Sequence, residues 1–205
     1  MNKNYIISSL NEMIEEPKCE LNYTSDYTLL IAILLSAQSL DKSVNKVTPI
    51  LFEKYPTLLD FKNADINELE KIIHPVGLSY NKSKAIKKLA TILVDQYNEV
   101  IPTSREELAK LPGIGNKTAG VFLIEYHNQN FIPVDTHVKR ISYRLGLVNE
   151  NDTPDQIEKY LTKYFKGENL SLIHQRMVLF GRYICTSKKP KCDECKFNKK
   201  CILTK

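Results

Sequence analysis

The stretch that decides the fold reads Leu111-Pro-Gly-Ile-Gly-Asn-Lys-Thr-Ala119. Before it, Thr103-Ser-Arg-Glu-Glu107 places a Glu three residues after each possible Thr or Ser cap, and the apolar run from Ala119 to Tyr126 follows it. Pro112 ends a first helix, while Gly113 and Gly115 allow positive φ and a close approach by another molecule. The sequence therefore predicts a helix, a tight turn and a second helix.

This predicted hairpin has two interpretations. Backbone N–H groups beside the N-terminus of a helix suit a phosphate. Lys117 lies in the first turn of the second helix, at the positive end of its dipole, where a neutral, nucleophilic amine is favoured over an ammonium. The alternative is a glycine-containing helix–helix turn with a solvated lysine, because short glycine motifs recur by chance.

The composition is that of a globular protein. The chain has 205 residues, 42% of them hydrophobic and 26% charged, which allows one domain or two small ones. The N-terminus lacks the apolar core of a signal peptide, and the longest apolar run, Leu29 to Leu35, is too short to cross a bilayer. We therefore expect a cytoplasmic protein without membrane contact, whose five cysteines form no disulfide framework.

Helical periodicity and capping signals recur along the chain, and no stretch alternates convincingly as a strand, so the predicted fold class is all-α. The expected helices carry Ile6 to Ile14, ending before Pro17; Asp26, as the cap, to Leu35; Val44 and Val47, with a restart at Thr48-Pro49; Asp65, in a capping box with Glu68, to about His74; and Ala85 to Tyr97. After the hairpin they carry Val138 to Leu145, capped by Asp135 and stopped by Gly146; Ile157 to Tyr164, after the capping box Thr153-Pro-Asp-Gln156; and Leu170 to Ile184.

Four cysteines lie close together near the end of the chain. Cys185, Cys192, Cys195 and Cys201 have six, two and five residues between them, so four thiolates can enclose one metal centre. The spacing alone leaves zinc and iron–sulfur open, since thiolates bind both. Cys19 stands apart and is expected to be a packed free thiol.

Basic residues gather in two regions. From Arg182 to Lys205 there are eight Lys or Arg against two acidic residues, and a second run contains Lys82, Lys84, Lys87 and Lys88. Both regions would suit a polyanion, and both could equally be solvated helix faces.

Taken together, these residues resemble the endonuclease III family of base-excision repair glycosylases over about Tyr27 to Cys201. The resemblance rests on Leu34-Leu-Ser-Ala-Gln38, Val76-Gly-Leu78, Leu111 to Ala119, Val134-Asp-Thr-His137, Gly181-Arg-Tyr183 and the cysteine spacing, all in family order. It implies two helical lobes with a DNA groove between them. Residues 22–132 would form a six-helix barrel with the helix-hairpin-helix motif at about 103–126, and residues 1–21 plus 133–205 a lobe holding a [4Fe-4S] cluster in the loop 185–201.

The resemblance also implies roles for individual residues. Lys117 matches the catalytic lysine and Asp135 the catalytic aspartate, whose simpler role is N-capping. Gln38 matches the residue that fills the hole left by an extruded nucleotide, and Leu78 the wedge in the opposite strand. The remaining expected DNA contacts are Gly113, Gly115, Thr118, His137, Lys189 and Lys191, while Cys185, Cys192, Cys195 and Cys201 would hold the cluster.

The implied activity is that of a monomeric glycosylase and abasic-site lyase acting on oxidised pyrimidines in double-stranded DNA, which would place it on the nucleoid. Asn116 and Gly120 depart from the family's usual Arg and Asn, which leaves the substrate range less defined. The adenine-mismatch branch lacks the lysine and carries a further C-terminal domain, whereas this sequence runs only four residues beyond Cys201. A thymine- or uracil-mismatch glycosylase and a non-catalytic DNA-binding protein with a structural zinc stay open.

Overall fold

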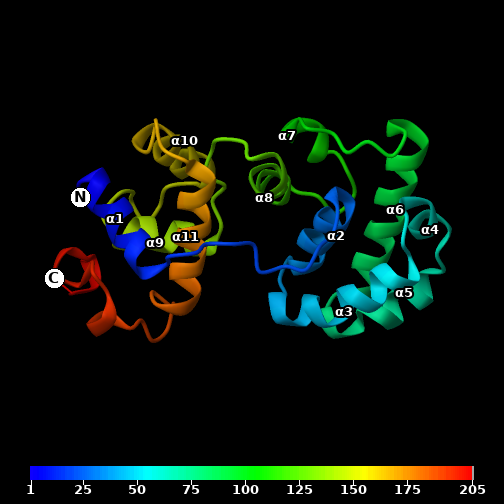
Figure 1. Ribbon diagram of the computed structural model, residues 1–205, viewed down its shortest axis with the longest axis horizontal. Coiled ribbons are helices and arrows are strands. Elements are labelled where there is room, and N and C mark those ends of the chain that lie inside the picture. The colour runs from blue at the N-terminus through cyan, green and yellow to red at the C-terminus, as the bar shows by residue number, and fades with distance from the viewer. Residues whose placement is uncertain (205) are drawn as a thin grey trace. The chain divides into compact units, whose positions relative to one another are not determined.

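A computed structural model describes residues 1–204, and those residues contain helices and no strand, which confirms the all-α prediction (Figure 1). The α-helices are α1 (Lys3–Met13), α2 (Asp26–Ser36), α3 (Asp41–Lys54), α4 (Leu58–Asn63), α5 (Ile66–Ile73), α6 (Ser79–Tyr97), α7 (Arg105–Leu108), α8 (Asn116–His127), α9 (Thr136–Arg144), α10 (Pro154–Tyr164) and α11 (Leu170–Tyr183). Short 3₁₀ turns are η1 (His74–Val76), η2 (Cys192–Glu194), η3 (Asn198–Lys200) and η4 (Ile202–Thr204). None of the described helices is long and apolar enough to cross a membrane.

Most helix starts follow from local capping. Thr153 and Gln156 form the predicted reciprocal box in front of Pro154, and the Asp65 side chain accepts hydrogen bonds from the N–H groups of Asn67 and Glu68. Glu68 does not complete a box with Asp65, because its carboxylate bonds Lys54 and Tyr55 instead. The predicted cap of α2 is also wrong. Ser25 caps that helix in a box with Thr28, which makes Asp26 the first helical residue.

The predicted restart at Thr48-Pro49 is wrong as well, since α3 runs through Pro49 without a break. Proline in a helix interior removes the bond to the carbonyl four residues back and costs about 3 kcal/mol. Here Val44, Val47 and Leu51 bury one face of α3, and the helix packs against α2 and α5. Tertiary packing therefore outweighs the local signal.

Contacts divide the chain into two compact units. One unit is continuous, Glu20–His127, and the other joins Met1–Cys19 to the chain from Asn128 onward. In the continuous unit α6 packs against α4, α5 and α2, while α2 also packs against α3 and α8. Every residue of α2 from Thr28 to Leu35 is buried, as the apolar character of this helix predicted.

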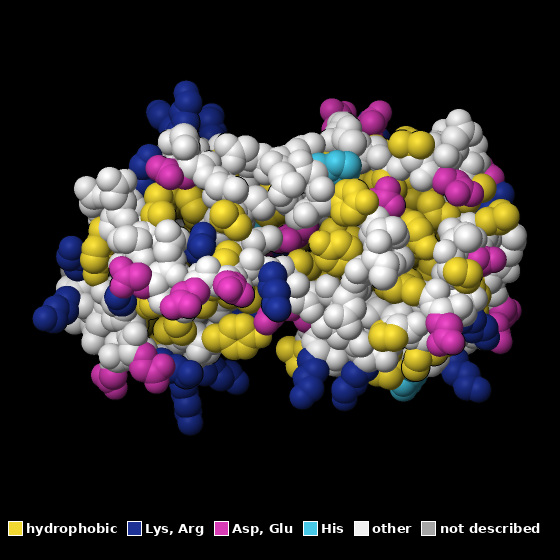
Figure 2. Space-filling model, in the orientation of Figure 1, with side chains coloured by type: hydrophobic (Ala, Val, Ile, Leu, Met, Phe, Trp, Pro, Cys, Tyr) yellow, Lys and Arg dark blue, Asp and Glu magenta, His cyan; other side chains and the backbone are white. Residues whose placement is uncertain are grey.

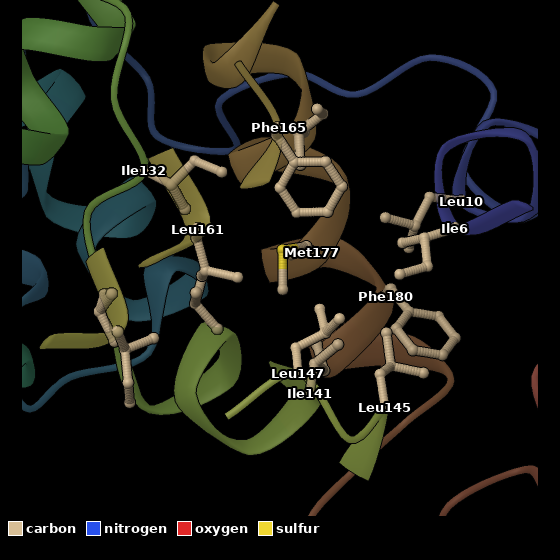
Figure 3. Close-up of a cluster of buried hydrophobic side chains, with 14 of the residues drawn as sticks. Ile6, Leu10, Ile132, Ile141, Leu145, Leu147, Leu161, Phe165, Met177 and Phe180 are labelled. Carbon is tan, nitrogen blue, oxygen red and sulfur yellow. The ribbon is translucent and has the colours of Figure 1, made fainter. Parts of the chain in front are cut away.

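The second unit has its own hydrophobic core, in which α11 packs against α9 and α1. Figure 3 shows Ile6 and Leu10 of α1, Met177 and Phe180 of α11 and Ile141 of α9 pointing into this core. Residues from both ends of the chain are therefore needed to close it.

Helices α9 and α11 approach each other closely at Gly181. A Cβ atom placed on Gly181 would lie 2.9 Å from both His137 Cβ and Ile141 Cδ1. The glycine of the Gly181-Arg-Tyr183 motif thus sets the distance between the two helices, because any side chain there would force them apart.

Candidate functional site

The hairpin between α7 and α8 is built on a tight turn. Ile114 N–H donates to Leu111 O at 3.1 Å, with Pro112 and then Gly113 in the central positions and Gly113 at φ +78°. Pro followed by a residue of positive φ is the pattern of a type II turn. Gly113 adopts the positive φ that glycine allows, whereas Gly115 does not.

Gly113 is also required by its surroundings. A Cβ atom on this residue would lie 2.7 Å from Leu34 Cδ1 and 3.0 Å from Ala85 Cβ, whereas a Cβ atom on Gly115 would meet nothing within 4 Å. The turn is therefore seated on α2 and α6 through Gly113. Gly115 is exposed and leaves the backbone open to another molecule.

Lys117 is exposed in the first turn of α8, as predicted, between the exposed Asn116 and the half-buried Thr118. Arg105 of α7 donates from Nε to Asn116 O at 3.1 Å, which fixes the start of α8 against the first helix of the hairpin. The N–H groups of a first helical turn lack intrahelical acceptors, so this surface can receive an anion next to the Lys117 amine.

Gln38 and Leu78 share an unusual backbone conformation. Ser39 N–H donates to Ser36 O at 3.0 Å, and Ala37 (φ −58°, ψ 118°) and Gln38 (φ 56°) fill the centre of a second type II turn. Leu78 precedes α6 at φ 52° and is 57% exposed. Glycine is the usual residue at such φ values, so both loops hold strain of about 1–2 kcal/mol per residue.

Asp135 caps α9, and its Oδ1 accepts from Val138 N–H at 2.7 Å, which confirms the predicted cap and leaves Oδ2 for another partner. His137 lies two residues further on, in the first turn of α9, and is half-buried where Arg140 Nη2 donates to its Nδ1 at 3.2 Å. Burial lowers the pKa of His137, and Arg140 and Arg182 lower it further against the opposing effect of Asp135.

The four clustered cysteines follow α11. Cys185 and Cys201 are buried, and Cys192 and Cys195 are half-buried. Burial raises the pKa of the Cys195 thiol, a backbone hydrogen bond at Phe197 opposes this, and the charges of the other three thiols raise it further. Cys195 therefore lies near the other three thiols, although no three His, Cys, Asp or Glu side chains among residues 1–204 are arranged to hold a metal ion. Four cysteine thiolates are the donor set that an iron–sulfur cluster takes.

Two arginines of α9 support this loop, and sequence reasoning missed their role. Arg144 Nη1 donates to Cys185 Sγ at 3.2 Å and to Thr186 O at 2.8 Å, while Arg140 Nε donates to Cys185 O at 3.2 Å. The two arginines are four residues apart and so lie on the same face of α9. The sequence shows this spacing, but it does not show that the cysteine loop packs against that face.

The loop is also held by α1. Tyr5 donates its hydroxyl hydrogen to Lys196 O, and the Lys200 ammonium lies 4.1 Å from the centre of the Tyr5 ring. Of the predicted DNA contacts in this loop, Lys189 and Lys191 are exposed, and Lys191 lies 3.9 Å from the Glu194 carboxylate. On the face that Figure 2 shows, Lys and Arg are interspersed with Asp and Glu in each unit, and several gather at the upper left edge of the view.

Lys82 differs from its expected place. The sequence grouped it with exposed lysines, yet it is only 6% exposed and burial lowers its pKa. Its amine instead bonds oxygens of the loops that carry Gln38 and Leu78.

The predicted site residues are divided between the two units. Lys117, Gln38 and Leu78 belong to the continuous unit, whereas Asp135, His137 and the cysteines belong to the other. The pairing of Lys117 with Asp135 therefore stays a prediction.

Comparisons with known proteins agree with this geometry. Residues 31–167 match the model of the HhH-GPD superfamily base excision DNA repair proteins. Endonuclease III of Bacillus subtilis (strain 168) is 38% identical over 93% of this chain and 87% of its own length. Endonuclease III of Rickettsia felis is 41% identical over 98% of this chain and 93% of its own length.

Solved structures give the same assignment. A trapped endonuclease III–DNA covalent intermediate superposes with a TM-score of 0.93 and 42% identity, covering 97% of this chain and 93% of that one. A thermostable thymine-DNA glycosylase has a TM-score of 0.85 at 22% identity over 98% of this chain and 94% of that one, which shows a shared fold alone. The chain belongs to the endonuclease III family of base excision DNA repair proteins and is a DNA N-glycosylase with apurinic or apyrimidinic site lyase activity.

Proposed function

We propose that this protein removes oxidised pyrimidines of the thymine glycol type from double-stranded DNA, with Lys117 as the nucleophile. The observation that carries the proposal is the exposed Lys117 amine in the first turn of α8, beside backbone N–H groups that suit a phosphate. The similar endonuclease III trapped as a covalent intermediate with DNA supports an attacking side chain.

In this mechanism the damaged nucleotide first leaves the base stack, because its glycosidic carbon cannot be reached within a duplex. The neutral Lys117 amine attacks C1′, the bond from C1′ to the base breaks, and the base leaves with a proton. The sugar ring opens and the amine becomes an iminium, which acidifies the hydrogen on C2′. Loss of that proton expels the 3′ phosphate, so the strand is cut on the 3′ side.

The other proposed residues assist this step. Asp135 would use Oδ2 to accept a proton or to stabilise the positive charge that develops on the sugar, while Oδ1 continues to cap α9. Leu78 would enter the opposite strand, and Gln38 would fill the space of the extruded nucleotide. Gly113, Gly115, Thr118, His137, Lys189 and Lys191 would contact the DNA backbone, which contributes affinity without sequence preference.

Cys185, Cys192, Cys195 and Cys201 would hold a [4Fe-4S] cluster. When bound, this group would cross-link the basic loop 185–201, and the proposed reaction requires no redox change from it. Arg144 and Arg140 already support the loop at Cys185. The experiment is an absorption spectrum of the purified protein with iron analysis. A yellow-brown protein with four irons is expected, and a colourless zinc protein would contradict this assignment.

The nucleophile is tested by borohydride trapping on two duplexes, one with thymine glycol and one with an abasic site. Wild type should form covalent adducts on both. Lys117→Gln should form none while still binding DNA, and Lys110→Gln, which removes an exposed hairpin lysine paired with Glu106, should react as wild type does. Adducts from Lys117→Gln would refute this nucleophile.

The substrate is tested by the same duplexes. A wild-type adduct at the abasic site alone would refute the oxidised-pyrimidine assignment, and a mismatched thymine or uracil duplex would then be the next substrate. No adduct on either duplex, from protein with its metal centre intact, would refute the Schiff-base chemistry proposed for Lys117.

A further inference from the structure

The most unusual charged group outside the proposed chemistry is the buried ammonium of Lys82. Lysine is almost never buried unless it is paired, because removing its charge from water is costly. Lys82 is 6% exposed, yet the partners of its Nζ atom are all neutral oxygens. Because no carboxylate is bonded to this buried cation, other groups of the fold must stabilise its charge.

The partners of Lys82 come from two separate loops. Nζ donates to Leu35 O and Ala37 O at 2.8 Å each and to Ser39 Oγ at 2.9 Å, which surround Gln38. It also lies 3.4 Å from Val76 O, two residues before Leu78. The Lys82 backbone N–H donates to Leu78 O at 3.0 Å. One residue thus binds two carbonyls before Gln38, the Ser39 hydroxyl after it, and the backbone on both sides of Gly77.

A second contact joins the same loops, since the Ser39 hydroxyl donates to Val76 O. The Leu35 carbonyl belongs to the last turn of α2, where carbonyls lack intrahelical partners and the helix dipole is negative. This explains how a cation is tolerated there without a carboxylate.

What the two loops share is strain. Gln38 and Leu78 both have positive φ, at 56° and 52°, although neither is glycine. Strained residues persist only where the surrounding structure over-determines them. The hydrogen bonds of Lys82 and Ser39 lie next to both strained residues and supply that restraint.

We propose that Lys82 is a positioning residue that holds Gln38 and Leu78 in their left-handed conformations, so that both side chains are ready to enter DNA as one unit. The inference rests on the proposed roles of Gln38 and Leu78. Lys82 touches neither the substrate nor the reacting atoms in this account. It acts by fixing the backbone that presents the two probing side chains.

The test measures extrusion of the target nucleotide and single-turnover strand cleavage on an abasic-site duplex carrying 2-aminopurine beside the lesion. Lys82→Met should slow both by about 10- to 100-fold, the loss expected when an active group is misplaced by about 1 Å. Lys82→Arg, which retains the charge and the donors, should recover part of the rate. Lys46→Met, which removes an exposed lysine of α3 to which we assign no role, should match wild type.

A double-mutant cycle separates positioning from a general loss of stability. In a Gln38→Ala/Leu78→Ala background, Lys82→Met should slow extrusion less than about twofold, because no probing side chains are left to position. An equal loss in both backgrounds would overturn the inference. If Lys82→Met does not fold, Ser39→Ala enters the same cycle, since it removes one of the two links to Val76 O.

The same variants distinguish the two proposals. If Gln38→Ala and Leu78→Ala leave extrusion at the wild-type rate, the proposed roles of these side chains fail, and the inference fails with them. If those two variants slow extrusion while Lys82→Met and Ser39→Ala do not, the proposed function stands and the positioning role of Lys82 is refuted.

Discussion

Replacing Gly113 by alanine tests how the hairpin is seated. Its φ of +78° costs an L-residue about 1–2 kcal/mol. The added methyl group would lie 2.7 Å from Leu34 Cδ1 and 3.0 Å from Ala85 Cβ, and overpacking of this kind costs about 1–3 kcal/mol. We therefore expect Gly113→Ala to lower the free energy of unfolding by about 2–5 kcal/mol.

The assay is urea denaturation followed by circular dichroism, with thermal unfolding as a second measurement. The expected loss corresponds to a fall in Tm of about 4–20 °C for a chain of this size. Gly115→Ala is the matched control, because its φ is not positive and its Cβ atom would meet nothing within 4 Å. The free energy of unfolding of that control should differ from that of wild type by less than about 0.5 kcal/mol. If the free energy of unfolding of Gly113→Ala also lies within that margin, the turn is not fixed by backbone conformation and packing as described.

Two further predictions concern the packing of α9 on α11. Gly181→Ala should lower the free energy of unfolding in urea by about 1–2 kcal/mol, because its clashes with His137 and Ile141 outweigh the gain in helix propensity. A variant at least as stable as wild type would show that α9 and α11 can move apart at no cost. His137 has a lowered pKa in the folded protein, so the unfolded chain binds a proton more readily, and the stability that this residue contributes should be lost as pH falls through about 6.5. Denaturation at pH 7.5 and 5.5 should therefore show a smaller pH-dependent loss in His137→Gln than in wild type, and an equal loss would contradict this reasoning.

Features with a local cause could be predicted from the sequence. The Asp135 cap, the Thr153 box and the stop at Gly146 each depend on a few neighbouring residues, and the structure confirms all three. Lys117 could be placed in the first turn of α8 for the same reason, because Pro112 and the two glycines fix the hairpin.

Features that depend on distant contacts could not be predicted. Pro49 stays inside α3 because that helix is packed on one face, and Lys82 is buried because carbonyls from other parts of the chain surround it. The two hairpin glycines look equivalent in the sequence, but only Gly113 faces α2 and α6. In each case the deciding atoms lie far away along the chain.

The Tyr5 hydrogen bond to the Lys196 carbonyl spans 191 positions of sequence, and it has a consequence for biosynthesis. During translation α1 emerges first but cannot dock until its packing partner α11 has been made, whereas Glu20–His127 is continuous and can fold as soon as it is complete. A folded middle segment replaces a long flexible loop between the two parts of the split unit, which reduces the entropy lost when they join. A chain cut short before α11 would therefore carry a finished hairpin and an exposed, unpartnered first helix.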